Sequence, residues 1–407
     1  MRSSRAIAAA AIALSAITGL AACGSSGGGS SASGSNGKVT LTWWNNGNNQ
    51  PLRGVYSAAI KTFEKSHSNI TIQNVPIQND TLQKTKIPLA LQGSNPPNIY
   101  QQWGGGALAQ QVTSGKVADI TSDVSSWIGG ISGTAGWQAN GKQYGVPVVQ
   151  HVVGFWYRKD IFQKAGITPP ATLKDLEADD VKLAKAGYAP IAVGGKDGWP
   201  DAFWWESFAL RDCPKATITS AIAGKNFSDA CFAKASTDLA AFIKTNPFQK
   251  GYNGTFAQQG AGSSAGLVAN GKAAMELQGD WDPSTMMGVS SNKNLPTELG
   301  WFPFPKTPGS AGSQTAVLAG GDGFSCTGSD AQVKACTEFL RFLDSPQEQD
   351  MLVGQGASGE PVLPSESKAI NLSATKTAAA YLPTADYTQR YFDTALPTKP
   401  GQNLNTA

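Results

Sequence analysis

The chain has 407 residues, 15% of them charged, with 32 Lys and Arg against 29 Asp and Glu. A chain of this length exceeds the size of one hydrophobic core, so we expect two domains or lobes. The near balance of charge, without a Lys- or Arg-rich cluster interleaved with aromatic residues, argues against nucleic acid as a partner.

The first residues carry the pattern of an export signal. Arg2 and Arg5 precede an apolar run over residues 6–14, and the sequence LAAC ends at Cys23. A basic start, an apolar stretch of about 7–15 residues and small residues at its end are typical of such signals. The Cys after Leu-Ala-Ala resembles the bacterial lipobox, in which the thiol is diacylated and becomes the new N-terminus. The alternative is a plain cleaved signal with an incidental Cys.

The segment after Cys23 is almost purely Gly and Ser, which is typical of a flexible linker. We therefore expect a signal peptide over residues 1–22, the lipidated Cys23 with its linker over residues 23–37, and an extracytoplasmic protein anchored to the outer face of the cell membrane. No second apolar run of about 18 residues follows, so no other segment is expected to span a membrane.

Beyond the linker, strand and helix patterns alternate. The β-branched and aromatic residues of 38–44 predict a strand, the spacing of apolar residues over 52–66 predicts a helix, and a strand follows at 70–75. This start is typical of a parallel α/β sheet. Further strands are predicted at 97–100, 145–149, 152–157, 189–193, 273–277 and 317–326. Further helices are predicted at 85–92, 104–114, from about 159, 173–186, 202–210, 231–245 and 331–343.

Six segments, in this order along the chain, resemble the extracellular solute-binding proteins of ABC sugar importers, the family that includes maltose-binding protein. Residues 198–208, followed by Cys213, resemble members that take up short xylan-type oligosaccharides. The six segments are 93–100 (GSNPPNIY), 144–147 (YGVP), 155–160 (FWYRKD), 270–275 (NGKAAM), 279–281 (GDW) and 335–345 (ACTEFLRFLDS).

The resemblance implies an α/β fold of the periplasmic-binding-protein type II, with two α/β lobes, a hinge and a ligand cleft between the lobes. One lobe would combine residues 38–149 with 320–353, and the other residues 150–319 with 354–407. The chain would cross between lobes near residues 148–151, 318–321 and 353–360. In open α/β sheets, ligands lie at the loops that follow the carboxyl ends of strands.

A neutral sugar needs aromatic rings for its C–H faces and planar donors and acceptors for its hydroxyls. Loops expected at the cleft carry such residues. Trp281 stands where the family has its main stacking Trp, and His151 where maltose-binding protein has a ligand-contacting carboxylate. We predict ligand contacts from Trp44, Asn46, Asn48, Asn49, Gln102, Trp103, His151, Lys196, Trp199, Asp280, Trp281, Gly321, Asp322, Tyr387 and Arg390. Trp43, Trp156, Trp204 and Trp205 are expected in packing.

Four cysteines remain beyond Cys23, and export would place them where disulfides persist. Their spacing makes Cys213–Cys231 and Cys326–Cys336 the simplest of three possible pairings. Metal binding is the alternative, but no CxxC motif and no nearby His support it.

Two strings are similar to catalytic motifs. Residues 262–266 (GSSAG) fit G-x-S-x-G, but a polar loop precedes them and both His residues, His67 and His151, lie upstream rather than late in the chain. Residues 266–273 nearly match a P-loop but lack the Ser or Thr that would hold magnesium. We therefore expect no catalysis, no metal and no cofactor.

Together these observations predict a lipid-anchored monomer that closes over a neutral oligosaccharide and delivers it to the subunits of a membrane ABC permease. Separate aromatic platforms at Trp44, Trp103, Trp199 and Trp281 favour a ligand of two or more rings, with xylo-oligosaccharides first. One alternative is a binding protein for a non-sugar solute, such as a polyol, a phosphate ester or a peptide. A secreted hydrolase is the other, since any two carboxylates could converge in the fold.

Overall fold

The computed structural model describes residues 37–356 and 358–406. The predicted signal peptide, the lipidated Cys23 and the linker up to residue 36 lie outside the described residues. Residues 38–407 form one compact unit. Within the described part of the chain, none of the helices is both long and apolar enough to cross a membrane. The division of this unit into two lobes at the boundaries given above stays a prediction.

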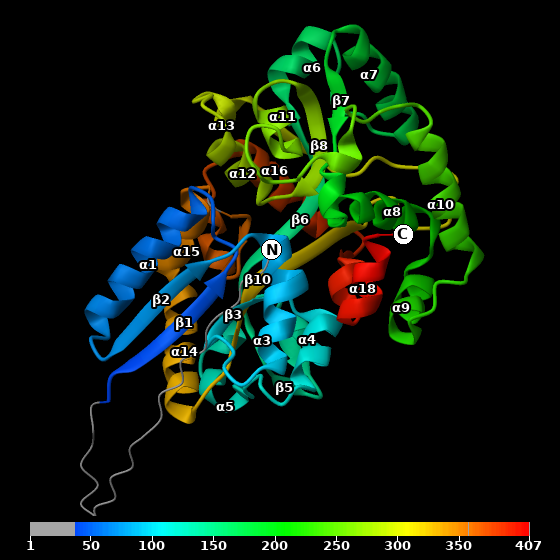
Figure 1. Ribbon diagram of the computed structural model, residues 1–407. Coiled ribbons are helices and arrows are strands. Elements are labelled where there is room, and N and C mark those ends of the chain that lie inside the picture. The colour runs from blue at the N-terminus through cyan, green and yellow to red at the C-terminus, as the bar shows by residue number, and fades with distance from the viewer. Residues whose placement is uncertain (1–36, 357, 407) are drawn as a thin grey trace, which may run out of the picture. The chain divides into compact units, whose positions relative to one another are not determined.

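The unit is built on a mixed sheet of ten strands (Figure 1). Its main path runs β2-β1-β3-β10-β6-β8-β7, with β9 and β11 paired to β6 and with β12 paired to β10. The strands are β1 (Val39–Asn45), β2 (Ile70–Pro76), β3 (Ile99–Gln102), β6 (Val146–Arg158), β7 (Ala189–Ala192), β8 (Ala273–Gly279), β9 (Leu299–Phe302), β10 (Val317–Cys326), β11 (Glu360–Pro361) and β12 (Thr388–Arg390), beside a separate pair, β4 (Gln138–Ala139) and β5 (Lys142–Gln143).

Helices connect these strands in most places where the periodicity predicts them, so the α/β class is confirmed. They are α1 (Leu52–Ser66), α2 (Asn79–Thr81), α3 (Ile87–Gln92), α4 (Gly105–Val112), α5 (Thr121–Val124), α6 (Lys159–Ala165), α7 (Leu173–Lys185), α8 (Trp199–Asp212), α9 (Lys215–Gly224), α10 (Ala230–Ile243), α11 (Ser264–Ala269), α12 (Asp282–Val289), α13 (Leu295–Glu298), α14 (Asp330–Leu343), α15 (Pro346–Gly354), α16 (Ser373–Tyr381), α17 (Phe392–Ala395) and α18 (Thr398–Leu404).

Helix α1 shows why the periodicity was informative. Its residues Val55, Tyr56, Ala59, Ile60 and Phe63 are buried, at the spacing of one helical face, and pack in the cluster that contains β1 and β2. The opposite face of α1 is polar and exposed. Such a helix can be recognised from the sequence because its apolar residues, which become the buried ones, recur with the helical repeat.

Strand β6 corrects one prediction. The two strands expected at 145–149 and 152–157 are one continuous strand, Val146–Arg158, whose first half pairs with β10 and β11 and whose second half pairs with β8 and β9. Because β6 is buried on both faces, its residues do not alternate between apolar and polar. His151 therefore lies in the middle of a strand rather than in a break between two strands.

The buried apolar residues form several clusters on the two halves of this sheet. One surrounds Trp43 of β1, and another contains Phe155 of β6 and Trp204 of α8. Trp43, Trp156 and Trp204 are fully or almost fully buried, and Trp205 packs half-buried against the cluster around Phe155. The prediction that these four Trp residues serve packing is confirmed.

Both predicted disulfides are present. Cys213, directly after α8, is bonded to Cys231 in α10, and Cys326 at the end of β10 is bonded to Cys336 in α14. The Cα atoms of the two pairs lie 5.1 and 6.1 Å apart. These distances lie within the range that a disulfide spans without backbone movement.

Opening the Cys213–Cys231 bond by replacing both residues with alanine is expected to lower the free energy of unfolding by about 2–3 kcal/mol, because the unfolded chain regains the freedom of the loop that the bond closes. Urea unfolding of the variant beside the wild type measures this loss. The reduced wild type serves as control and should lose at least as much stability. Alkylation of four thiols in the unreduced protein would contradict both bonds.

Candidate functional site

A cavity of about 110 Å³ lies where several strands of the sheet end. Asn46 follows β1, Asn79 follows β2, Trp103 follows β3, Trp281 follows β8 and Tyr391 follows β12. Five strands thus bring their carboxyl ends to one place, where ligands of open α/β sheets are expected. The lining comprises Asn46, Asn48, Asn49, Leu52, Asn79, Gln83, Trp103, Trp199, Phe203, Gln258, Trp281, Ser284, Thr285, Asp322, Ser358, Tyr391, Asp393 and Thr394.

Trp281 is the centre of an aromatic group in this cavity. Its ring centroid lies 5.9 Å from that of Trp199, 6.2 Å from that of Tyr391 and 6.3 Å from that of Phe203. The first two contacts are edge-to-face, an arrangement that aromatic rings favour over a direct sandwich. Trp281 also precedes the first turn of α12. The ring is therefore held by its neighbours on several sides while it remains part of the cavity wall.

The C-terminal segment reaches the cavity through strand pairing. β12 lies parallel to β10, with Ala319 opposite Arg390, and the next residue, Tyr391, enters the lining. The Tyr391 ring lies directly against the backbone of Gly320, where an added Cβ would come within 2.3 Å of the ring. Glycine at this position therefore permits the close approach of Tyr391 to β10.

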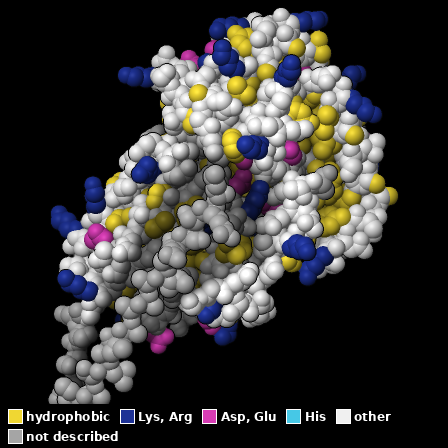
Figure 2. Space-filling view, viewed as in Figure 1, with side chains coloured by type: hydrophobic (Ala, Val, Ile, Leu, Met, Phe, Trp, Pro, Cys, Tyr) yellow, Lys and Arg dark blue, Asp and Glu magenta, His cyan; other side chains and the backbone are white. Residues whose placement is uncertain are grey.

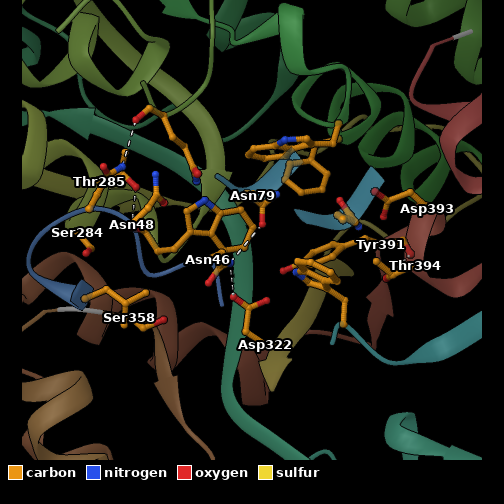
Figure 3. A pocket seen from close by; sticks show the side chains of 18 residues that line it. Asn46, Asn48, Asn79, Ser284, Thr285, Asp322, Ser358, Tyr391, Asp393 and Thr394 are labelled. Carbon is orange, nitrogen blue, oxygen red and sulfur yellow. Dashed lines mark hydrogen bonds between the residues drawn. The ribbon is translucent and has the colours of Figure 1, made fainter. Parts of the chain in front are cut away.

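Asn46 and Asp322 make the main polar contact in the cavity (Figure 3). The Nδ2 atom of Asn46 donates to Oδ1 of Asn79 at 3.2 Å and to Oδ2 of Asp322 at 3.3 Å. In the same view, Ser284 and Thr285 extend from one side, and Asp393 and Thr394 lie on the opposite side. The cavity is thus walled by amides, hydroxyls and two carboxylates.

Several polar atoms of the lining are buried without a hydrogen-bond partner among the described residues. They are Oδ1 of Asn46, Nε1 of Trp281 and the hydroxyl of Tyr391. Buried polar groups of native proteins are nearly always hydrogen-bonded, and an unpaired one costs about 1–3 kcal/mol. A ligand with hydroxyl groups would supply an acceptor for the Trp281 donor and a donor for Asn46.

A buried charged group lies beneath the aromatic wall. Nδ1 of His151 is 2.5 Å from Oδ1 of Asp280, and Nε2 of His151 is 3.7 Å from Oδ2 of Asp322. The His151 ring is also edge-to-face with Trp281, at 4.9 Å between centroids. Burial alone would lower the pKa of His151, but the charge and hydrogen bond of Asp280, together with Asp322, outweigh it and raise that pKa to about 10. His151 is therefore cationic at neutral pH.

The family described as bacterial extracellular solute-binding protein matches residues 46–350. The chain belongs to this family. An uncharacterized ABC transporter extracellular-binding protein of Pyrococcus horikoshii is 26% identical over 76% of this chain and 68% of that protein. The multiple sugar-binding protein of Streptococcus mutans is 24% identical over 75% of this chain and 71% of that protein.

A solved structure from work on xylan utilization by Caldanaerobius polysaccharolyticus has the same fold. It superposes with a TM-score of 0.82 at 23% sequence identity, covering 90% of this chain and 94% of its own. The type II periplasmic-binding-protein fold expected from the sequence is thereby confirmed. Members of the family bind solutes and are not enzymes, as the sequence predicts.

The string GSSAG has a structural role in this solute-binding protein. The Ser263 hydroxyl accepts a hydrogen bond from the Gly266 amide at 3.1 Å and so caps α11. Ser264, which would be the nucleophile of the motif, is fully buried, and its hydroxyl donates to the Ala257 carbonyl at 3.3 Å. In the described ranges, no group of three or more His, Cys, Asp or Glu is arranged to hold a metal ion.

Seven of the predicted contact residues are brought together in the cavity lining. Six of them lie in the loop after a strand or at the start of a helix, and Asp322 lies within β10. The seven are Asn46, Asn48, Asn49, Trp103, Trp199, Trp281 and Asp322. Trp103, Trp199 and Trp281, three of the four predicted aromatic platforms, line this one cavity.

Three further predicted residues lie beneath the cavity rather than in its wall. His151 and Asp280 are 2% and 3% exposed. They contact Trp281 and Asp322 and can act on a ligand only through them. Gly321 is also buried, and an added Cβ there would lie 2.7 Å from the Val149 carbonyl. The need for glycine at 321 therefore comes from the neighbouring strand and not from a ligand.

Gln102 and Arg390 support Trp103 from outside the lining. Oε1 of Gln102 accepts hydrogen bonds from the amides of Trp103 and Gly104, at 2.9 and 3.1 Å. The Arg390 guanidinium donates to the Trp103 carbonyl at 2.5 Å. Both predicted residues thus hold the Trp103 backbone in place, which is a positioning role.

The other three predicted residues lie elsewhere. Trp44 packs half-buried against the cluster around Tyr100 and Trp137. The Lys196 ammonium lies over the Phe256 ring, 3.8 Å from its centroid, and Tyr387 lies beneath the ammonium of Lys215. None of the three lines the cavity. A residue near a strand end reaches a ligand only when its side chain points to the same side as the cavity.

Eleven lining residues were not predicted, and some of them had a signal in the sequence. Phe203 follows Trp199 by four residues on α8, and Gln83 follows Asn79 by four, so each shares a helical face with a neighbour in the lining. Others come from distant segments with no such signal. The eleven are Leu52, Asn79, Gln83, Phe203, Gln258, Ser284, Thr285, Ser358, Tyr391, Asp393 and Thr394.

Buried carboxyl groups should make this protein less stable as the pH rises from about 4 to about 8. Burial raises the pKa of Asp282 to about 7, and raises those of Asp180 and Glu360 to about 8. A carboxyl whose folded pKa is raised favours folding below its unfolded pKa and loses that contribution as pH rises through the folded pKa. We expect the free energy of unfolding to fall between about pH 4 and pH 8, as measured by urea unfolding across that range.

Asp180→Asn is the control for this prediction, because neither carboxylate oxygen of Asp180 has a partner among the described residues. The variant should flatten part of the decline with pH. Stability that rises steadily from pH 4 to pH 8 would contradict the expected sign.

Proposed function

We propose that this solute-binding protein captures a neutral oligosaccharide of two or more pentose or hexose units, with xylo-oligosaccharides first, for uptake by a membrane ABC permease. In this proposal it acts as a monomer, tethered to the outer face of the membrane through a lipid on Cys23. Binding proceeds by hinge closure and involves no chemistry.

The lining of the cavity carries the proposal. Aromatic rings around Trp281 offer surfaces for the C–H faces of a sugar, and unpaired atoms of Asn46, Trp281 and Tyr391 offer hydrogen-bonding groups for its hydroxyls. Among the lining residues that the structure describes there is no Lys or Arg, whereas Asp322 and Asp393 are present. A phosphate or carboxylate ligand would require the opposite charge. The lining therefore favours an uncharged, hydroxylated ligand.

Contacts between segments that the sequence assigns to different lobes support closure around the ligand. Nζ of Lys84 donates to the Asp197 carbonyl at 2.6 Å, and Nδ2 of Asn49 donates to the Gln258 carbonyl at 3.5 Å. Asn49 and Gln258 both line the cavity. Closure of a hinge is driven by contacts that exist only in the closed state, and a ligand that touches both segments would add to them.

The ligand can be identified by calorimetric titration of the protein with xylose, xylobiose, xylotriose, cellobiose, maltose and chitobiose, with phosphate and amino acids as controls. We expect tight binding of at least one di- or trisaccharide and none of the charged controls. Tight binding of a monosaccharide or an amino acid without any di- or trisaccharide would overturn the proposal.

The anchor is tested separately by growing cells with a labelled fatty acid. Incorporation of the label into the wild type, and its loss in Cys23→Ser with release of the protein from the membrane, is the expected result. Wild-type protein that takes up no label and is found free in the medium would contradict the lipid anchor.

A further inference from the structure

The turn that follows β2 contacts the start of α8 beside the cavity. Asp80 lies in α2, and Lys84 lies in the π-helical turn Leu82–Lys86 that follows directly. Nζ of Lys84 donates to the backbone carbonyl of Asp197, 113 positions further along the chain, at 2.6 Å. Asp197 ends the short helical turn that precedes α8. We call Asp80, Lys84, Asp197 and Trp199 the junction.

The junction connects two walls of the cavity. Asn79 and Gln83, the chain neighbours of Asp80 and Lys84, line the cavity, and Trp199 lines it from α8. Asp80 and Lys84 themselves are not among the lining residues. π-Helical turns are rare and occur frequently at functional sites. Asp80 and Lys84 can therefore hold the two walls together without touching a ligand.

The ammonium group of the junction is poorly placed to neutralise Asp80. Nζ of Lys84 lies 3.7 Å from Oδ1 of Asp80, which is too far for a hydrogen bond, since it is bonded to the Asp197 carbonyl. Oδ1 of Asp80 is buried and accepts no hydrogen bond from the described residues. Oδ2 of Asp197 already accepts from the Ala257 amide at 2.8 Å. The junction thus brings two carboxyl groups together with one ammonium group that is engaged elsewhere.

A carboxyl group in the position of Asp80 is expected to hold a proton. Burial raises the pKa of Asp80 to about 7; Lys84 opposes this rise, and the charge of Asp197 and a hydrogen bond with its side chain add to it. With a proton, Asp80 donates to Asp197 instead of repelling it. Two further carboxyl groups lie nearby. They are Asp393 of α17, which interacts with the charge of Lys84, and Asp201 of α8, whose side chain lies against the turn that ends at Asp197.

From these contacts we infer that Asp80 is a positioning residue through which closure of the cavity takes up one proton from the solvent. The inference rests on the proposed function, in which ligand capture proceeds by closure. When the junction parts, Asp80 meets water and releases its proton, as a carboxyl group with the ordinary pKa of about 3.9 does at neutral pH. When the junction forms, the proton returns to Asp80 and is hydrogen-bonded to Asp197. Ligand capture is then stronger in acidic than in neutral surroundings.

The sign of this effect follows from the two states of Asp80. A carboxyl group whose pKa is higher in the closed state stabilises that state fully below its pKa in the open state, and loses this contribution as the pH rises through its pKa in the closed state. For Asp80 the window runs from about pH 4 to about pH 7. Within it, the equilibrium constant for closure falls by up to about tenfold for each unit of pH.

The test measures the dissociation constant and the number of protons taken up, by calorimetric titration at pH 5, 6, 7 and 8.5 in two buffers that differ in ionisation enthalpy. The probe is whichever of xylobiose, xylotriose, cellobiose, maltose and chitobiose the wild type binds most tightly. Asp80→Asn is the test variant, because its amide can still donate to Asp197 but takes up no proton. Asp123→Asn is the matched control, since Asp123 is exposed on α5 and lies outside the cavity lining.

For the wild type and for Asp123→Asn we expect uptake of about one proton at pH 6 and almost none at pH 8.5, with a dissociation constant that rises about ten- to hundredfold from pH 5 to pH 7. Asp80→Asn should take up about one proton fewer at pH 6 and show a rise at least about fivefold smaller. Lys84→Met keeps the carboxyl group but removes the opposing charge, so its affinity should fall at higher pH than that of the wild type. Absence of proton uptake in the wild type, or equal uptake in Asp80→Asn, overturns the inference while leaving sugar binding in place.

A wild type that binds none of the five sugars would count against the proposed ligand, and the junction is then judged on the protein without sugar. Small-angle X-ray scattering at pH 5 and pH 8 measures the radius of gyration. A wild type that is more compact at pH 5 than at pH 8, beside an Asp80→Asn variant that does not change with pH, supports the junction. A wild type with the same radius at both pH values overturns it.

Discussion

Replacing Trp281 with alanine is expected to weaken sugar binding by about 2–4 kcal/mol, which is roughly a 30- to 900-fold rise in the dissociation constant. The ring is the centre of the aromatic group in the cavity and carries an unpaired indole N–H. The variant loses both the stacking surface and this donor. Calorimetric titration with the sugar that the wild type binds best measures the loss.

Trp44→Ala is the matched control for this prediction. Trp44 is half-buried like Trp281 and belongs to the same residue type, but it packs outside the cavity. The Trp44→Ala variant should retain wild-type affinity and lose only some stability, because Trp44 packs against the cluster around Tyr100 and Trp137. Near-normal affinity of Trp281→Ala, or an equal loss in both variants, would contradict the assignment of the cavity as the binding site.

Replacing Asp280 with alanine is expected to lower the free energy of unfolding by about 3–5 kcal/mol at mildly acid pH, because it leaves His151 buried without its closest partner. The variant also loses the hydrogen bond from the Val152 amide to Oδ2 of Asp280, at 3.2 Å. Urea unfolding of the wild type and the variant at pH 6 and pH 9 measures the difference.

The pH dependence distinguishes the loss of this ion pair from a loss of packing. In the wild type the pKa of His151 is raised to about 10. The pair therefore stabilises the folded state fully below about pH 6.5, the ordinary pKa of histidine, and loses this contribution as pH rises towards 10. The gap in stability between wild type and Asp280→Ala should be larger at pH 6 than at pH 9. A gap that does not change with pH would contradict the ion pair.

Two positions show how far sequence reasoning reached into the site. Trp281 was predicted as a stacking residue from the short motif that contains it, and it stands in the cavity wall. His151 was predicted as a ligand contact from its place in the chain, and it is buried between Asp280 and Asp322. The sequence predicts that both residues lie near the site, but the direction of each side chain depends on the backbone around it, which is β6 for His151 and the turn after β8 for Trp281.

The C-terminal segment shows where the sequence carried no signal. Tyr387 and Arg390 were predicted in the cleft, whereas Tyr391, Asp393 and Thr394 line the cavity. Their placement follows from the parallel pairing of β12 with β10, which joins residues about seventy positions apart. A strand as short as β12 shows no periodicity of its own, so neither its register nor the side chains it directs to the cavity can be predicted locally.

The sequence by itself determined the α/β class, most of the strands and helices, the two disulfide pairings and the family, because these depend on local periodicity, short cysteine spacings and ordered motifs. Only the tertiary structure decided which strand ends share the cavity, that three Trp residues line it together, and that Trp103 also lines a second, smaller cavity. These features arise when distant segments meet, and the free energy of that packing depends on contacts among all of them rather than on any single stretch of chain.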